Sequence, residues 1–527
     1  METHRLSLCM IVRDEETMLP DFLTSVQGLW DELCVVDTGS SDATVTLLTE
    51  AGAKLTHRPW DDDFSAARNA SLAMATGDWI LYLDADERMT PELATAIRNV
   101  MSNDQAGAAT VLLRDDLPGG LRRETRLLRL FRHDPDIRFL HRIHEDPTES
   151  VLESLKHSKR RVVAIDGVLE HLGYRKDLTD GRGKKERDLS MLERCLADNP
   201  DDWYSRHKML ELSSFWDDIP LWQQLSRDAW ARLEHADKSM LATTAHAGEM
   251  FVIIAGGLQR SGDDLIAMIE PWRDHIPPSV DYLTALGLAH ESEGRLENAA
   301  AEFHQAVALA DQLGLPAAAV RPQLALARLS AAVNDLDNAI ERVWLALDGS
   351  PVDPEALLAL VFFSSLTGND FSWRERYEQS YGRSTPWLAT LGDHALREQR
   401  WSDAIALFTE AAGSPPAGQA AERLAQAHFG NGAHQKARDL AASLMETQPS
   451  AALGVLVCDM IAGRDLSLDV DIDQESADAA LTAWVDILWS SGDTEAMTAL
   501  LDRLGTVIDI FPWLPTHLRE LTNRLMS

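Results

Sequence analysis

Two aspartates, Asp84 and Asp86, follow directly on the most apolar strand-like run of the chain, residues 79–83 (WILYL). Residues i and i+2 of a strand point to the same side, so both carboxylates are expected to face one place. Because burying an uncompensated charge is costly, something positive must lie beside them. A nearby Arg or Lys meets that need, and so does a divalent cation that prefers oxygen ligands, Mg²⁺ or Mn²⁺. Such a cation could join the carboxylates to a diphosphate.

Charged residues also end the two preceding strand-like runs. They are Arg13, Asp14 and Glu15 after residues 6–12, and Asp37 after residues 33–37. Asp37 is followed by TGSSD, in which a Gly and two hydroxyls before a helix predict a tight turn and a helix N-cap. A bound ligand explains charged residues at three strand ends on one rim of a sheet better than three unrelated coincidences do.

The elements that must position these residues alternate along the first 190 residues. Apolar strand-like runs at 6–12, 33–37 and 79–84, with a weaker one at 54–57, are separated by helical patterns at 17–29, 42–51 and 64–76. Continuous apolar strands between helices predict a mostly parallel sheet covered on both faces. In such sheets ligands bind beyond the carboxyl ends of the strands. The acidic run at 60–63 is expected to be a solvated loop and helix cap.

Composition excludes several classes of protein. The chain has 527 residues with 49 basic and 84 acidic side chains, a formal net charge of −35, which disfavours nucleic acid and anionic membranes as partners. The four scattered cysteines fit a reducing compartment without disulfides or a zinc site. No apolar run approaches the length of a membrane span, and the start does not read as a signal peptide. We therefore expect a soluble cytoplasmic protein of several domains.

After residue 190 the sequence has a helical periodicity, is rich in Ala and Leu, and contains internal repeats. Four pairs of small residues are each separated by twelve positions, the spacing expected where the two helices of a tetratricopeptide unit cross: Gly287 and Ala299, Ala327 and Ala339, Gly392 and Ala404, Ala425 and Ala437. A generic helical bundle is the alternative. The predicted segments are an α/β domain at 1–190, a helical connector at 191–275, tetratricopeptide-like repeats at 276–450 and a helical region at 451–527.

Three stretches together carry a resemblance to a known family: LSLCMIVRDEE (6–16), VVDTGSSDAT (35–44) and FSAARNASLAMATGDWILYLDADE (64–87). In order and spacing they resemble the N-terminal half of glycosyltransferase family 2, over about 175 residues. The chain is similar to bacterial members with tetratricopeptide-like tails, including peptide S-glycosyltransferases of the sublancin type, and to lipopolysaccharide-core glucosyltransferases. The resemblance implies an α/β GT-A domain, Rossmann-like with a mostly parallel sheet, followed by an all-α solenoid.

The resemblance also implies roles for the donor side of the site. Asp37 and the loop of Arg13, Asp14 and Glu15 would hold the uridine or its ribose. Asp84 and Asp86 would carry Mn²⁺ or Mg²⁺ on the diphosphate. The remaining pair, Arg68 and Asn69, resembles an Arg-Asn pair near the phosphates. For Arg68 a structural ion pair with Asp86 or Glu87 is the alternative.

Members of this kind invert the anomeric centre and need a general base for the acceptor. Many of them carry a Glu-Asp pair after the acceptor segment, and we find none in the expected place. An Arg-Ile-His-Glu step at 142–145, which recurs in members with tetratricopeptide-like tails, makes Glu145 the candidate base and His144 a candidate helper. The alternative is an exposed His-Glu turn that is paired with Arg142. The EHLGY step at 170–174 resembles a motif of the same members and makes His171 a candidate metal ligand. The alternative is that His171 is a structural histidine. The Gln-x-x-Arg-Trp motif of processive synthases is missing, which disfavours a polymer-extruding enzyme.

The sequence thus predicts an inverting, metal-dependent transfer of one sugar from a UDP-sugar to a protein or peptide, onto a Ser/Thr hydroxyl or a Cys thiol. The repeats would supply the acceptor surface or a contact between copies of the chain in a homo-oligomer. Two alternatives remain: addition to a lipopolysaccharide core or other glycan, and a non-catalytic repeat adaptor. The carboxylates at positions 37, 84 and 86 argue against the adaptor.

Overall fold

The structure is a computed structural model that describes residues 4–116, 122–156, 158–172, 181–236, 238–241, 246–367, 372–414, 416, 418–466 and 474–510. Contacts divide the chain into two compact units, residues 1–353 and 354–527, each considered by itself below. The four predicted segments are finer than this division, and their boundaries stay predictions.

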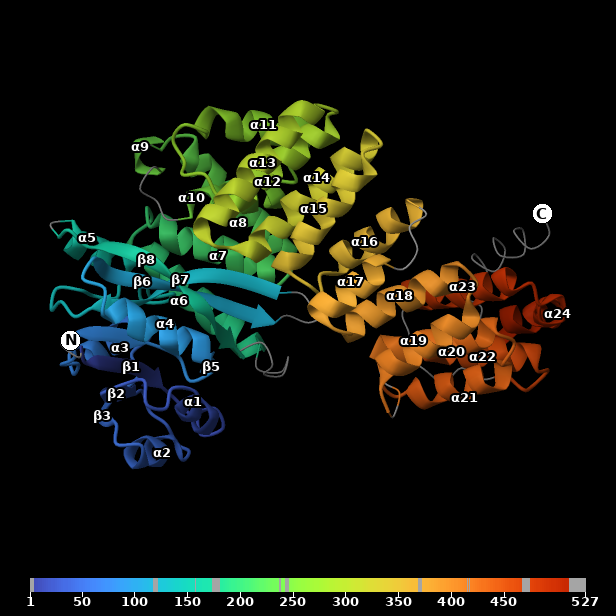
Figure 1. The fold of residues 1–527 in the computed structure, drawn as a ribbon, viewed down its shortest axis with the longest axis horizontal. Coiled ribbons are helices and arrows are strands. Elements are labelled where there is room, and N and C mark those ends of the chain that lie inside the picture. The colour runs from blue at the N-terminus through green and yellow to red at the C-terminus, as the bar shows by residue number, and fades with distance from the viewer. Residues whose placement is uncertain are drawn as a thin grey trace. The chain divides into compact units, whose positions relative to one another are not determined.

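The first unit opens with a mixed sheet whose strands, in the described part of the chain, run in the order β3-β2-β1-β4-β7-β6-β8-β5 (Figure 1). The strands are β1 (Leu6–Val12), β2 (Glu32–Asp37), β3 (Lys54–His57), β4 (Trp79–Tyr82), β5 (Glu87–Met89), β6 (Ala106–Asp116), β7 (Arg122–Arg132) and β8 (Arg161–His171). β1 to β4 pair in parallel, as the sequence predicts. β7 is antiparallel to both β4 and β6, and β5 is antiparallel to β8.

Helices lie between these strands: α1 (Leu19–Ser25), α2 (Thr44–Glu50), α3 (Phe64–Leu72), α4 (Pro91–Met101) and α5 (Thr148–Leu155). α3 packs on β1 and β2, and α4 packs on β6 and β8. The predicted cap in the acidic run is confirmed, because the side chain of Asp63 accepts a hydrogen bond from the N–H of Ala66 at the start of α3.

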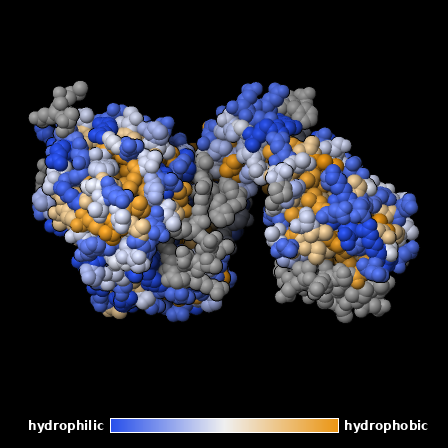
Figure 2. Space-filling view, turned by 90° about the horizontal axis from the view of Figure 1, so that it is seen from below, coloured by the Kyte–Doolittle hydropathy of each residue, from blue (hydrophilic) through white to orange (hydrophobic). Residues whose placement is uncertain are grey.

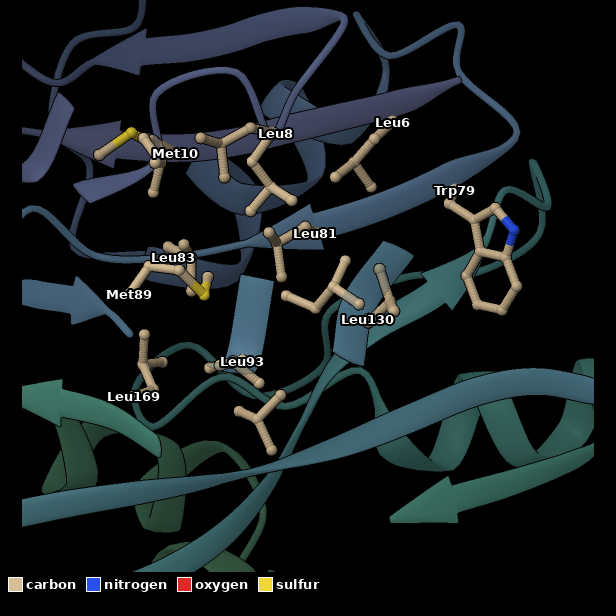
Figure 3. Packing of buried hydrophobic residues seen from close by; sticks show 14 of the residues in the cluster. Leu6, Leu8, Met10, Trp79, Leu81, Leu83, Met89, Leu93, Leu130 and Leu169 are labelled. Carbon is tan, nitrogen blue, oxygen red and sulfur yellow. The ribbon is translucent and has the colours of Figure 1, made fainter. Parts of the chain in front are cut away.

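The sheet is held by an apolar core beneath the strand ends. Leu6, Leu8 and Met10 of β1 are fully buried, and they face Leu81 of β4 and Leu130 of β7 (Figure 3). Strands apolar at nearly every position form because both faces of the sheet are covered. This rigid base fixes where the polar residues that follow each strand emerge.

The rest of the first unit is helical: α6 (Gly181–Asp198), α7 (Trp203–Phe215), α8 (Ile219–Leu233), α9 (Lys238–Leu241), α10 (Ala247–Gly257), α11 (Gly262–Ile269), α12 (Val280–Ser292), α13 (Leu296–Leu313), α14 (Val320–Ala332) and α15 (Leu336–Gly349). The second unit contains α16 (Pro354–Leu366), α17 (Ser372–Tyr381), α18 (Thr385–Arg397), α19 (Trp401–Ala412), α20 (Gly418–Gly430), α21 (His434–Leu444), α22 (Ala451–Ile461), α23 (Gln474–Ser491) and α24 (Thr494–Ile510). The predicted architecture, an α/β domain followed by helices, is confirmed.

The small residues of the predicted repeats lie at helix crossings. A Cβ built on Gly287 would come within 2.4 Å of the Phe303 ring, and one on Gly392 within 2.6 Å of the Phe408 ring. Each glycine thus lets an aromatic ring sixteen positions later press against its helix backbone. The same packing in α12–α13 and in α18–α19 supports the helical-hairpin repeat over a generic bundle.

On the face that Figure 2 shows, hydrophilic residues cover most of each unit, and apolar residues gather in patches between them. No helix in the described part of the chain is both long enough and apolar enough to cross a bilayer.

Candidate active site

The carboxyl ends of β1 and β2 lie side by side, because Val12 pairs in register with Asp37. Asp37 is 2% exposed and accepts hydrogen bonds from the backbone N–H of Ser40 (3.0 Å) and of Gly39 (3.3 Å). Nδ1 of His57 also lies 2.9 Å from Oδ2 of Asp37. Burial raises the pKa of Asp37, but the hydrogen bonds from Ser40 and His57 outweigh it and hold the pKa below its usual value. Asp37 is therefore a fixed carboxylate.

The loop after β1 is tied to the loop after β2. Asp14, whose φ is 52°, accepts from the backbone N–H of Ser41 at 2.7 Å and donates its own N–H to Ser40 Oγ at 3.0 Å. The N–H of Glu15 donates to Thr44 Oγ1 at 2.7 Å. Arg13 is more than half exposed. The predicted uridine-binding residues thus come together at one rim, and their role in binding stays a prediction.

Asp84 and Asp86 do not lie on a strand, since β4 ends at Tyr82. The strand geometry expected for them is therefore wrong, and their carboxylates have different partners. Asp84 Oδ1 accepts from Nη2 of Arg68, whereas Asp86 Oδ2 lies 3.2 Å from Nε2 of His171. The expected positive partner of Asp84 is an arginine.

Arg68 joins two of the predicted site residues. This side chain, 4% exposed on α3, donates through Nη2 to Asp84 and through Nε to Glu145 Oε1 at 3.0 Å. Arg68 is thus in an ion pair, as the alternative had it, but with Asp84 and Glu145 rather than with Asp86 or Glu87, and Glu145 pairs with Arg68 rather than with Arg142. Burial disfavours the charge of Arg68, but the Asp84 and Glu145 carboxylates overcome this and raise its pKa. One guanidinium thus links the end of β4 to the candidate base.

A second buried arginine, Arg129 on β7, completes this layer. Its Nη2 donates to Glu87 Oε1 and lies 3.9 Å from Asp84 Oδ2. The Tyr82 ring lies near both guanidinium groups, 4.7 Å from Cζ of Arg129 and 5.7 Å from Cζ of Arg68. Glu87 also accepts from the N–H of Asp84 at 2.9 Å. Burial raises the pKa of Glu87 to about 7 against the opposing charge of Arg129.

His171, at the end of β8, lies between two carboxylates. Its Nδ1 is 2.6 Å from Oδ1 of Asp115, which is 2% exposed, and its Nε2 faces Asp86. Burial lowers the pKa of His171, but the contacts to Asp115 and Asp86 outweigh it and raise the pKa to about 10. Gly173 and Tyr174 of the same predicted motif lie outside the described residues.

The donor set suits a divalent cation. A buried carboxylate on Nδ1 that turns Nε2 toward a second carboxylate is the arrangement that orients metal-binding histidines. Among the residues that the structure describes, no three His, Cys, Asp or Glu side chains already form a metal site. Asp86 and His171 already face each other, and with Asp84 as the third predicted ligand a cation would take its remaining oxygens from a diphosphate and water.

The segment that carries Glu145 is braced by α3. Both ends of the Asn69 amide are used on the backbone of Phe139, donating to its oxygen (3.0 Å) and accepting from its N–H (2.8 Å). The N–H of Phe64 donates to the carbonyl of Arg142 at 2.8 Å. In this structure Asn69 serves the loop rather than an open phosphate site, and its role beside phosphates stays a prediction.

Two residues of the same segment, His141 and His144, have left-handed backbones with φ of 65° and 54°. For residues other than glycine this conformation costs about 1 kcal/mol each. Such strain persists where surrounding contacts impose it, and it is common at functional sites. His144 contributes its backbone carbonyl to these contacts, accepting from the hydroxyl of Tyr204 at 2.6 Å.

Sequence reasoning missed four residues of this constellation: Glu87, Asp115, Arg129 and Tyr204. Arg129 lies in the basic run at 122–132 and Glu87 directly follows the Asp-x-Asp step, so each had a weak signal. Asp115 is brought to His171 by strand register, and Tyr204 comes from a helix sixty positions after His144. No local pattern marks either of them.

Comparison with known proteins identifies two regions of the chain. Residues 7–163 match the model of glycosyl transferase family 2, and residues 390–452 match a tetratricopeptide repeat. A TPR repeat-containing protein of Synechococcus elongatus is 40% identical over 314 residues, 58% of this chain and 76% of that protein. The SPbeta prophage-derived glycosyltransferase SunS of Bacillus subtilis is 25% identical over 206 residues, 38% of this chain and 47% of its own length. The match therefore spans about half of that enzyme.

Solved structures overlap this chain only in part. Glucosyl-3-phosphoglycerate synthase of Mycobacterium tuberculosis, in complex with Mn²⁺ and UDP-glucose, gives a TM-score of 0.26 at 17% identity over 36% of this chain and 79% of that one. S. aureus TarS in complex with UDP-GlcNAc gives a TM-score of 0.30 at 13% identity over 52% and 92%. Overlaps this weak say nothing about ligands. The matches in sequence identify the chain as a glycosyltransferase with a family 2 domain at residues 7–163 and tetratricopeptide repeats after that domain.

Proposed function

We propose that this glycosyltransferase moves a single sugar from a UDP-sugar, with inversion, to a hydroxyl or thiol of a protein or peptide. The observation that carries the proposal is the bridge made by Arg68 between Asp84 and Glu145. Asp84 stands at the rim where a donor diphosphate would lie, and Glu145 is the candidate base for the acceptor. A direct transfer needs the leaving group and the base held in one rigid frame.

The donor would lie at the shared rim of β1, β2 and β4. Asp37 and the loop of Arg13, Asp14 and Glu15 would hold the uridine, and Asp84, Asp86 and His171 would hold Mn²⁺ or Mg²⁺ on the diphosphate. When bound, the cation would stabilise the negative charge that develops on the departing UDP. Arg68 would keep the Glu145 carboxylate oriented, since a guanidinium fixes both direction and distance.

Glu145 would take the proton from the acceptor hydroxyl or thiol as the new bond to the anomeric carbon forms. Its side chain is 14% exposed, so it can be reached while remaining partly shielded from water. The ion pair with Arg68 holds this carboxylate in place for that step. His144 would assist from the same loop.

A protein or peptide acceptor is supported by the second unit. Besides its tetratricopeptide match, it has a cavity of about 560 Å³ between α17, α18 and α19. Leu391 and Leu407 line it beside Trp373, and Arg383 and Glu410 stand among its charged lining residues. An apolar base with charges of both signs suits a polypeptide segment better than a bare glycan.

The test measures UDP release from UDP-glucose and from UDP-N-acetylglucosamine, with Mn²⁺ and with a chelator. The wild-type chain should release UDP only with the metal, Asp86→Ala should lose the activity while remaining folded, and Glu145→Gln should lower the rate while UDP binding is kept. Retained activity in Asp86→Ala would overturn the metal assignment. Equal losses of rate and binding in Glu145→Gln would remove it as the base.

The acceptor is tested by intact-mass analysis of proteins that co-purify with the chain. A mass increase of one sugar on a polypeptide is expected. Sugar on a lipid-linked or free glycan instead would replace the protein acceptor with a glycan one.

A further inference from the structure

The loop that carries Glu145 is held from two sides, and only one side belongs to the family-2 region. On the first side, α3 contacts the loop through Asn69 and Phe64. On the second side, the loop contacts α7, which begins at Trp203, forty residues beyond the end of the family match at 163. The helical part of the first unit is therefore in direct contact with the candidate catalytic loop.

The contact with α7 is both polar and apolar. The Tyr204 hydroxyl donates to the carbonyl of His144, the residue before Glu145, at 2.6 Å. The Tyr204 ring stacks on the ring of His141, with centroids 3.9 Å apart and planes 13° from parallel. Between these two points, Ile143 is 4% exposed and packs with Met209 of α7.

Tyr204 thus touches the two residues of the loop whose backbone is left-handed. A strained loop adopts one conformation only if contacts on each side of it agree. In the described part of the chain the hydroxyl hydrogen-bonds to the carbonyl of His144 alone, and burial raises the pKa of Tyr204, so it stays protonated and donates. No hydrogen bond joins Tyr204 to the Glu145 side chain among these residues, so Tyr204 would act on Glu145 through the backbone.

We infer that Tyr204 is a positioning residue: its hydroxyl and ring, presented by α7, fix the loop of residues 139–146 so that Glu145 meets Arg68 in the orientation needed for proton transfer. This inference rests on the proposed role of Glu145. It makes the helical region after residue 190 a part of the catalytic unit in addition to any part in acceptor binding.

The variant Tyr204→Phe removes the hydroxyl alone and keeps the ring against His141. With UDP-glucose and UDP-N-acetylglucosamine as probe donors and Mn²⁺ present, we expect kcat for UDP release to fall about tenfold, the factor that one lost hydrogen bond in the transition state implies. KM for the donor should stay unchanged. The matched control is Tyr282→Phe, since Tyr282 is a buried tyrosine of α12 whose hydroxyl has no hydrogen-bond partner in the described residues.

The double variant Tyr204→Phe/Glu145→Gln separates positioning from general stability. If Tyr204 acts through Glu145, the double variant is no slower than Glu145→Gln alone. Multiplying losses would overturn the inference. If Glu145→Gln itself is as fast as the wild type, the proposed base is wrong, and that result is distinct from a failure of Tyr204.

Amide hydrogen exchange on the full chain gives a readout that needs no donor. The N–H of Leu140 and of Asp146 each donate to the other residue's carbonyl, at 3.1 and 3.2 Å, and so report on closure of the loop. In Tyr204→Phe these two amides should exchange faster, while those of the β1 core should not change. Unchanged exchange at both would overturn the inference whatever the activity shows.

Discussion

Two arginines in the two units each bridge a pair of carboxylates, yet they stand in opposite settings. Arg68 joins Asp84 and Glu145 with 4% of its side chain exposed, and Arg383 of the second unit joins Glu378 and Glu410 with 37% exposed. A solvated pair gains little because water screens it, whereas a buried pair is retained against a large desolvation penalty. The comparison teaches that the bridge at the sheet rim keeps its charge against a desolvation penalty, while the bridge made by Arg383 stays in contact with water.

The same contrast holds for what each region buries. The sheet rim buries Arg68, Arg129 and Glu87 in ion pairs. The repeats bury glycine against aromatic rings, as at Gly392 and Phe408. The rim thus buries ion-paired charge and these helix crossings bury close apolar contacts, and the following changes test that difference.

The largest effect is expected at Arg68. Arg68→Met keeps the volume of the side chain but leaves Asp84 and Glu145 without their shared cation. We expect UDP release to be lost and the free energy of unfolding to fall by about 3 kcal/mol, measured by urea denaturation. A variant as stable and as active as the wild type would remove the distinction between the two arginines.

A smaller effect is expected in the repeats from Gly392→Ala. Its Cβ would come within 2.6 Å of the Phe408 ring, so α18 and α19 must separate. Overpacking of this kind lowers the free energy of unfolding by about 2 kcal/mol, whereas Ser402→Ala on the exposed face of α19 should change nothing. UDP release with small donors should persist, since this glycine is outside the catalytic unit. Loss of UDP release at unchanged stability would contradict the division of roles.

A pH effect is expected from His207 of α7. This histidine is buried without a charge, whereas the residues buried at the sheet rim are charged. Burial lowers its pKa from 6.5 to about 3. Between these values the unfolded chain binds a proton that the folded chain excludes, so the free energy of unfolding falls as the pH falls, by about 1.4 kcal/mol per unit. Denaturation curves at pH 6.5 and 5.5 should show a smaller loss for His207→Gln than for the wild type. Equal losses would mean that His207 is protonated in the folded chain.

The smallest effect is expected at Arg383. Arg383→Ala should lower the free energy of unfolding by less than about 1 kcal/mol, and that loss should shrink further in high salt. A loss as large as that of Arg68→Met would show that exposure does not decide the strength of these bridges.

The sequence predicted the parts of the molecule that depend on local patterns. The runs at 6–12 and 33–37 became β1 and β2 nearly residue for residue, because apolar strands between polar turns have few alternatives. The twelve-residue spacing of small residues predicted the helical hairpins, because this spacing is also a local pattern. Asp37, Asp84 and Asp86 became candidate site residues because charged residues stand at the ends of such apolar runs.

The rest could not be read because it depends on residues distant in the chain. Arg68 and Glu145 are 77 positions apart, and their ion pair needs α3 and the loop at 139–146 to meet. The end of β4 at Tyr82 is set by the register with β1 and β7 rather than by the apolar run itself. The sequence around Asp115 and around Tyr204 does not indicate which distant residues each of them contacts.

The most direct test of the account is calorimetric titration of the full chain with UDP, in Mn²⁺ and then in a chelator. The account predicts that UDP binds in the presence of Mn²⁺, and that removing the metal or changing Asp86 to Ala weakens this binding strongly. No affinity for UDP with Mn²⁺ present would contradict the claim that the carboxylate rim holds a metal-bound sugar nucleotide.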